Sequence, residues 1–251
     1  MTNWWSELYD DQLADVLLDS TDPDDDAATV RFLVDVLGLE AGSRVFDQCA
    51  GTGRLSIPLA RWGAQVVGVE QAARYVERAR IRAKEAGVDA TFLAGDAFEL
   101  VPDAPCNAAI NWWTSFGYLR DDGGNARMLQ RAFEALVPGG RFALDYPNVP
   151  NLYAAWRPQQ IDRRMVRGEE IMLLRESELD VANGLLHKRW TFVAPSGRRS
   201  DRRTTIRLYT PDRLAALVAS VGFVDIRLLG GIDGHAITLD SPRCILVARR
   251  P

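Results

Sequence analysis

The fold is decided by one stretch of the chain, Val45-Phe46-Asp47-Gln48-Cys49-Ala50-Gly51-Thr52-Gly53-Arg54-Leu55. It begins as an apolar strand and passes through Gly51 and Gly53 into a helical pattern. Glycine at such a turn lets a ligand approach the backbone closely, because no Cβ intervenes. The turn alone is weak evidence, since a dinucleotide fingerprint would need a third glycine where Ser56 stands. The stretch predicts a strand, a glycine turn and a helix that together face a ligand.

Strands and helices alternate outward from this stretch. We expect helices over 26–37, 55–62, 72–86 and 126–136, and strands over 44–48, 65–70, 90–94, 108–112 and 141–146. Strict alternation implies right-handed crossovers and a parallel sheet that helices cover on both faces.

The pattern changes after residue 146. Polarity alternates with period two in three segments, 171–179, 185–194 and 202–209, and turns at 183–184 and 195–197 separate them. A helix over 211–221 and strands over 223–229 and 244–248 follow. Period two with such turns is typical of an antiparallel meander. The sequence therefore predicts an α/β fold, a seven-stranded, mostly parallel, doubly wound sheet with an antiparallel β insertion after the fifth strand.

The length of the chain suggests one domain over residues 1–251. Folds of this class often form a single domain at this size. Within it, residues 1–25 would form an N-terminal helical lid, and residues 150–210 would form the insertion and contribute to the substrate pocket. The lid carries Trp4, Trp5 and Tyr9, which either cover the strand ends or simply hold a helix against the core.

Composition excludes several classes of protein. No apolar run approaches the roughly 20 residues that cross a bilayer, and the acidic N-terminus lacks the basic region of a signal peptide. The net charge of −4 disfavours a nucleic-acid partner, and we interpret the arginines of 198–203 as a solvated hairpin turn. Three widely spaced cysteines show no metal-ligand spacing. We expect a cytoplasmic protein without membrane, nucleic acid or metal.

Two further acidic residues follow strands. Glu70 ends the second strand and could accept hydrogen bonds from both hydroxyls of a ribose, while Asp96 follows the third and could accept from an exocyclic adenine amine. Open α/β sheets bind ligands at the carboxyl ends of their strands, where both acids stand. The alternative is that each acid only caps the helix or turn that follows it.

Together these residues resemble the class I S-adenosylmethionine (SAM)-dependent methyltransferases over nearly the whole chain. The likeness is greatest to the bacterial small-molecule branch, which includes amino-sugar and glycine/sarcosine-type N-methyltransferases. The motifs that carry it are VFDQCAGTG (45–53), GVE (68–70), AGDAFEL (94–100), NWWTSFGYL (111–119), PGGR (138–141), RLYT (207–210) and DSPR (240–243). One departure is Cys49, which replaces the usual first-motif glycine.

The resemblance implies methyl transfer from SAM, with S-adenosylhomocysteine (SAH) as product, to a small molecule, most simply to an amine nitrogen. It implies no metal and a monomer or homodimer. The implied cofactor contacts are Asp47, Cys49, Ala50, Gly51, Gly53, Leu55, Glu70, Gln71, Asp96, Ala97, Asn111 and Trp112. Candidate substrate contacts are Trp4, Trp5, Tyr9, Trp113, Ser115, Tyr118, Asn148, Arg207 and Tyr209. Candidate catalytic residues are His235, Tyr146 and Asn111.

Four alternatives remain open at this stage. O-methylation of a hydroxyl or carboxylate would use the same cofactor site, with a general base for a hydroxyl. A nicotinamide-dependent oxidoreductase is disfavoured by the missing third glycine. A nucleic-acid or protein methyltransferase is the third alternative; amino-methylating nucleic-acid enzymes carry a Pro-Pro segment after the fourth strand, where this chain has Trp112-Trp113-Thr114. A binding module that does not methylate is the last alternative.

Overall fold

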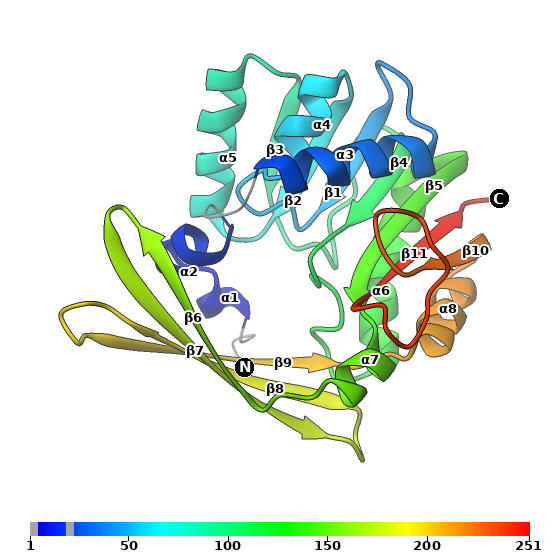
Figure 1. Cartoon of the computed structure of the whole chain (residues 1–251). Helices are drawn as coiled ribbons and strands as arrows, with labels where there is room; N and C mark the ends of the chain where they lie inside the picture. Colours follow the sequence, from blue (N-terminus) through cyan, green and yellow to red (C-terminus); the bar gives the residue numbers. More distant parts are fainter. Residues whose placement is uncertain (1–4, 19–22) are drawn as a thin grey trace.

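The parallel sheet predicted from the sequence is present in the computed structural model, which describes residues 5–18 and 23–251. Seven strands lie in the order β10-β11-β5-β4-β1-β2-β3 (Figure 1). Their bounds are β1 (Arg44–Gln48), β2 (Gln65–Glu70), β3 (Ala90–Ala94), β4 (Cys106–Asn111), β5 (Leu136–Pro147), β10 (Val224–Leu229) and β11 (Arg243–Arg249). Only β11 runs antiparallel to its neighbours. The chain order reverses between β1 and β4, and ligands of open α/β sheets bind outside the strand ends at such a point.

Helices cover both faces of this sheet. One face packs against α3 (Pro23–Leu37), α4 (Ser56–Trp62) and α5 (Ala73–Ala86), and the other against α6 (Asp122–Ala135) and α8 (Pro211–Ser220). Successive side chains of β1 point to opposite faces of the sheet. Val45 therefore joins the core under α3 and α4, while Phe46 joins the core under α6. Both residues are fully buried, so the position of the glycine turn after β1 is fixed from both sides.

The β insertion has four strands rather than the predicted three. They are β6 (Gln159–Val166), β7 (Glu169–Asp180), β8 (Leu185–Val193) and β9 (Arg199–Arg207), paired antiparallel in chain order. Strand β6 escaped prediction because it is an edge strand with mostly exposed, polar residues. Its one local signal is the Arg167-Gly168 turn, where φ is positive at both residues, as in two-residue hairpins. A short helix, α7 (Val149–Ala154), precedes the insertion.

The start of α6 also differs from the prediction. The helix begins at Asp122 rather than at residue 126, because the Asp121 side chain caps it by accepting from the backbone N–H of Gly124. Two glycines in the first turn disguise that start. Among the helices of the described residues, none has the length and apolar character needed to cross a bilayer.

The N-terminal segment is helical and lies between the parallel sheet and the insertion (Figure 1). It consists of α1 (Trp5–Leu8), α2 (Asp11–Leu13) and the π-helical turn η1 (Ala14–Leu18). Leu8, Leu13 and Val16 pack against apolar residues of β7 and β8. On the sheet side, Tyr75 donates a hydrogen bond to the Asp10 carbonyl at 2.6 Å. The segment therefore bridges the two sheets, while Trp4 lies outside the described residues.

Candidate functional site

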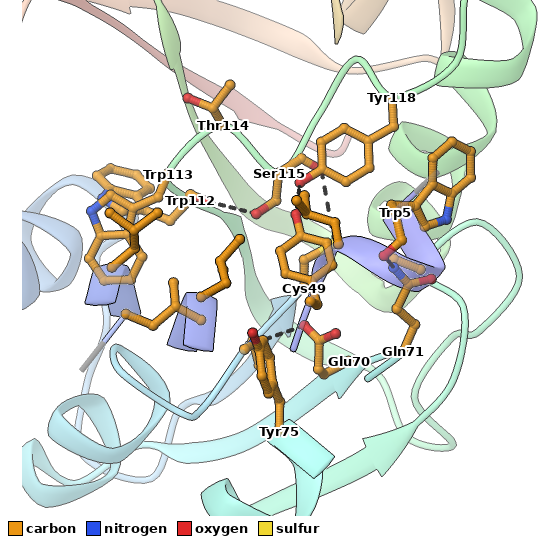
Figure 2. A pocket seen from close by; sticks show the side chains of 18 of the residues that line it. Trp5, Cys49, Glu70, Gln71, Tyr75, Trp112, Trp113, Thr114, Ser115 and Tyr118 are labelled. Carbon is orange, nitrogen blue, oxygen red and sulfur yellow. Dashed lines mark hydrogen bonds between the residues drawn. The ribbon is translucent and has the colours of Figure 1, made fainter. Parts of the chain in front are cut away.

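A cavity of about 460 Å³ lies where the carboxyl ends of β1, β2 and β4 meet the N-terminal segment and the insertion. Pockets for small ligands typically measure about 300–1,000 Å³. We call the residues contributed by the parallel sheet the strand-end wall: Asp47, Cys49, Ala50, Gly51, Glu70 and Asp96. We call those of the insertion the insertion wall: Arg175, Lys188, Trp190, Thr204 and Ile206. Figure 2 shows Glu70 and Tyr75 on one side of the space, opposite Ser115 and Tyr118.

The two glycines of the first turn have different roles. Gly51 lines the cavity with φ +57°, and a Cβ there would have only Leu18 nearby, at 3.8 Å. Gly53 has φ +82° and does not line the cavity; a Cβ there would lie 3.0 Å from Phe92 and 3.1 Å from Ile57. Gly51 thus opens the backbone to a ligand, whereas Gly53 permits the helix to pack against the sheet.

The structure explains the unusual Cys49. Its φ is +66°, a left-handed conformation that costs an L-residue with a side chain roughly 1–2 kcal/mol. Glycine avoids that cost, so the family's usual residue matches the backbone better than cysteine does. The Cys49 thiol donates weakly to the Ser115 carbonyl at 3.9 Å, and burial together with the nearby charge of Glu70 holds its pKa well above the ordinary value. The thiol is therefore protonated and unreactive.

Glu70 both caps the start of α5 and faces the cavity. One carboxylate oxygen accepts from the Ala72 N–H at 2.8 Å, just before α5, and the other from the Gly51 N–H at 3.1 Å. A carboxylate has about four acceptor positions, so capacity remains for a ligand. Asp96 is similar, since it accepts from the Phe98 N–H at 2.9 Å and lines the cavity. Capping and ligand binding by these two acids are therefore compatible.

Asp47 is the most enclosed acid of the strand-end wall, with 4% of its surface exposed. The Ser56 hydroxyl donates to it at 2.6 Å. Burial raises the pKa of Asp47 to about 6, the Ser56 hydrogen bond opposes that rise, and the charge of Glu70 adds to it. Burial likewise raises the pKa of Glu70. Within residues 5–18 and 23–251 these carboxylates form no salt bridge, and they would gain from a cationic partner.

Aromatic side chains enclose the remaining space. Trp5 packs against Phe98 and Tyr118 with ring centroids 6.0 and 5.8 Å apart. The Arg54 guanidinium lies 3.8 Å from the ring centroid of Trp113, whose backbone is left-handed at φ +53°. The buried Asp145 fixes that strained loop, because its carboxylate accepts from the Trp113 N–H at 3.0 Å.

Most of the residues proposed from the sequence come together around this cavity. Of the proposed cofactor contacts, those that line it are Asp47, Cys49, Ala50, Gly51, Leu55, Glu70, Gln71, Asp96, Ala97 and Trp112. Of the proposed substrate contacts, those that line it are Trp5, Tyr9, Trp113, Ser115 and Tyr118.

Two residues proposed for catalysis lie behind the cavity wall, and the structure corrects their assignment. Asn111 is buried, and its amide donates to Gln48 at 3.2 Å, which in turn donates to the Met128 carbonyl at 2.9 Å. Tyr146 is fully buried and donates to the Arg207 carbonyl. Both side chains therefore join β-strands to their surroundings instead of facing a ligand.

Four more of the residues proposed for catalysis or substrate binding do not line the cavity. His235 stands on an exposed loop, where its ring contacts Asp233 and Ser241. Asn148 donates to the carbonyls of the loop at 238–241. Arg207 and Tyr209 both donate to Asp122, at 3.1 and 3.0 Å. None of these four lines the cavity, and the side-chain oxygen of Asn148 is buried without a hydrogen-bond partner among the described residues.

Several lining residues were not predicted. They are apolar residues of the N-terminal segment (Leu8, Leu13, Leu17, Leu18), Thr52, Arg54 and Tyr75 near the first turn, and the whole insertion wall. The leucines alternate with acids at helical spacing, a signal that could have been used. The insertion wall carries no local motif, because its residues meet only through strand pairing.

Comparisons with known proteins agree with the fold. The model of a family described as "Methyltransferase domain" matches residues 39–182, more than half of the chain. The chain belongs to that family. Its fold is that of the class I SAM-dependent methyltransferases, as the sequence resemblance implied.

Two solved methyltransferases share the fold over almost the full chain. The CcbJ methyltransferase from Streptomyces caelestis aligns with a TM-score of 0.78 and 19% identity, over 99% of this methyltransferase and 98% of that chain. SAM-bound CalS10, an amino pentose methyltransferase from Micromonospora echinaspora, aligns with a TM-score of 0.67 and 19% identity, over 91% of each chain.

A curated relative shares a short segment. The 23S rRNA (uracil(1939)-C(5))-methyltransferase RlmD of Shewanella halifaxensis (strain HAW-EB4) is 47% identical over 62 residues, which are 25% of this methyltransferase and 14% of that protein. The chain thus spans a small part of that relative's length. Within the described residues, no group of three or more histidine, cysteine or acidic side chains is arranged to hold a metal ion.

Proposed function

We propose that this enzyme transfers a methyl group from SAM to the nitrogen of a small-molecule amine held between the strand-end wall and the insertion wall. The observation that carries the proposal is that the three acids and the glycine turn border the same enclosed space as the insertion. A site confined between two sheets suits a small acceptor, because its volume limits the size of what enters.

The residues of the strand-end wall fit SAM. Its sulfonium and ammonium groups are cationic, and Asp47, Glu70 and Asp96 line the space, where they form no salt bridge with any described residue. We propose that Glu70 accepts from the ribose hydroxyls, Asp47 from the methionyl ammonium and Asp96 from the adenine amine. Gly51 lets the ligand approach the loop, since no Cβ stands between.

SAM, when bound, supplies a methyl group already activated by the positive sulfonium. The chain then has to position the acceptor and exclude water. Alignment of two reactants can remove roughly 7–11 kcal/mol of barrier. The rings of Trp5, Trp113 and Tyr118 line the space where the acceptor would lie, and aromatic faces attract cationic groups by about 0.5–2 kcal/mol each. An amine acceptor needs only to arrive unprotonated, so this wall can serve it without a dedicated base.

The experiment has two stages. Calorimetry with SAH should show stoichiometric binding, and NAD should give no heat. Mass spectrometry with SAM should then show a single added methyl on members of an amine panel and none on the alcohols of matched shape or on purified rRNA. Methylated alcohols would favour the O-methylation alternative. Methylated rRNA would favour a nucleic-acid acceptor, such as the rRNA named for the RlmD relative. Absence of SAH uptake would contradict the proposal itself.

A further inference from the structure

Lysine is almost absent from this chain. Of the 30 lysine and arginine residues only Lys84 and Lys188 are lysines. Lys84 stands exposed on α5, as surface cations ordinarily do. Lys188 instead stands on β8 and lines the cavity. The sole lysine away from the ordinary surface is therefore placed beside the proposed acceptor.

The insertion presents Lys188 from the middle of its sheet. In the strand register, Lys188 is paired with Ser177 of β7 and Thr204 of β9. Residues two apart on a strand share a face, so Lys188 lies on the same face as the core residue Leu186 and as Trp190 of the insertion wall. Strand pairing on both sides of β8 holds the backbone in place, and the ammonium projects from a rigid support.

No partner neutralises this ammonium. Within the part of the chain that the structure describes, Lys188 makes no salt bridge and no side-chain hydrogen bond. Two cations act on Lys188 through their charges, and each is itself paired with an acid, since Arg175 donates to Asp162 at 2.7 Å and Arg243 to Asp145 at 2.7 Å. Lys188 therefore contributes the uncompensated positive charge of the insertion wall.

That charge persists at neutral pH. Burial and the charges of Arg175 and Arg243 lower the pKa of Lys188 to about 8. At pH 7 about nine-tenths of such a lysine is still protonated. An unpaired charge taken out of water is costly, and an anion brought to it relieves that cost.

We propose that Lys188 binds an anionic group on the methyl acceptor, a carboxylate or a phosphate, so that the substrate is an amine that also carries an acid. The inference rests on the proposed function, because it assumes that the acceptor occupies the side of the cavity next to the insertion. The strand-end wall would hold the cationic SAM and the insertion wall the anionic end of the acceptor. Opposite charges at the two walls would fix the direction in which the amine enters.

The competing role for Lys188 is that of a general base. Only about one-tenth of its population is unprotonated at pH 7, given a pKa of about 8. A base of that kind would serve every amine alike, whereas an anion site would serve only acidic amines. The two roles therefore predict different specificity, and the experiment below separates them.

The test uses the two lysines together. Acetylation of the SAH-loaded enzyme, followed by mass spectrometry, reports Lys188 and the internal control Lys84 in one digest. The probes are sodium acetate, inorganic phosphate, an amino acid and its carboxamide, at constant ionic strength. We expect the anionic probes to protect Lys188 at least threefold and the carboxamide to give no protection, with Lys84 unaffected throughout. Acetate and phosphate as separate probes tell the two kinds of acid group apart. Equal reactivity of Lys188 with all probes would overturn the proposal.

Substitutions give a second, independent readout. Lys188→Met keeps the length of the side chain without the charge, Lys188→Arg keeps the charge, and Lys84→Met is the matched control. Loss of a charged hydrogen bond predicts that Lys188→Met lowers kcat/KM for the amino acid relative to its carboxamide by about 10- to 100-fold, mainly through KM. Lys188→Arg should retain most of that preference. An equal fall in kcat for both acceptors in both variants would assign Lys188 as a base and overturn the anion site. SAH binding, measured in each variant, is expected to stay within about threefold, and a wild-type enzyme that takes up no SAH would instead contradict the proposed function.

Discussion

The two walls of the cavity differ in charge, in construction and in how the sequence encodes them. The strand-end wall is acidic, and backbone N–H groups of the loops hold its carboxylates in place. The insertion wall is basic, and side chains on a pleated face form it, with one ammonium unpaired among the described residues. Acids fixed by the backbone suit a cofactor that never changes, whereas side chains on a sheet can be exchanged without disturbing a loop. We infer that the first wall serves the common chemistry and the second the choice of acceptor.

Glu70→Gln should cause the largest loss of SAH affinity at the strand-end wall. Replacing the carboxylate removes a charged acceptor and places an amide beside the Gly51 N–H. Loss of a charged hydrogen bond to each ribose hydroxyl predicts about 100-fold weaker SAH binding, near 2.7 kcal/mol. Calorimetry measures it, with the exposed Glu85→Gln on α5 as the control. A change of less than threefold would mean that the cofactor does not lie against Glu70.

Gly53→Ala should disturb packing behind the strand-end wall without removing a cavity residue. Positive φ and the approach of Phe92 at 3.0 Å together predict a loss of about 2–3 kcal/mol in the free energy of unfolding. Gly139→Ala shares the positive φ but has nothing within 4 Å, so we expect about 1 kcal/mol there. Urea unfolding compares the two. Equal losses would show that crowding at Gly53 is relieved by relaxation.

Acidification should weaken SAH binding at the strand-end wall and leave the charge of the insertion wall unchanged. If SAH requires ionised Asp47, whose pKa is about 6, affinity should fall about 10-fold between pH 7 and pH 5, with proton release on binding near pH 6. Lys188 stays protonated over this range. Because the folded pKa of Asp47 exceeds its unfolded value, its contribution to apoenzyme stability decreases as pH rises from about 4 to 6. Calorimetry in buffers of different ionisation enthalpy measures the protons, and pH-independent affinity would contradict the assignment.

Tyr75→Phe should give the smallest effect of these four changes. It loosens the hold of α5 on the N-terminal segment, which lies between the two walls. It removes the hydrogen bond to the Asp10 carbonyl, worth about 1 kcal/mol. We expect SAH to dissociate about fivefold faster, measured by stopped flow, because the N-terminal segment opens more readily. Tyr153→Phe, on the exposed face of α7, is the control. An unchanged rate would show that this hydrogen bond does not hold the segment closed.

The strand-end wall could be predicted because its signals are local. The expected strands over 44–48, 65–70 and 90–94 coincide with β1, β2 and β3, and the acids directly follow or end them. Parallel strands bring their carboxyl ends to one edge, so order along the chain is enough to place Glu70 and Asp96 together. The positive φ of Cys49, which only the coordinates show, explains why that position ordinarily favours glycine.

The rest could not be predicted, for geometric reasons. Successive side chains of a strand point to opposite faces, so a shift of one residue decides whether a side chain at a strand end faces the cavity. For this reason Asn111 and Tyr146 were assigned to the cavity although they are buried behind it. His235 was proposed for its chemistry, whereas its loop lies outside the cavity. Lys188 was passed over because the face of β8 that borders the cavity follows from its pairing with β7 and β9, not from any local pattern.

A crystal structure with SAH and an acidic amine bound tests the central claim most directly. The account predicts the ribose hydroxyls within hydrogen-bond distance of Glu70, the sulfur facing the space between the walls, and the acid group of the amine against Lys188. SAH bound elsewhere, or the acid group turned toward Asp47 and away from Lys188, would contradict it.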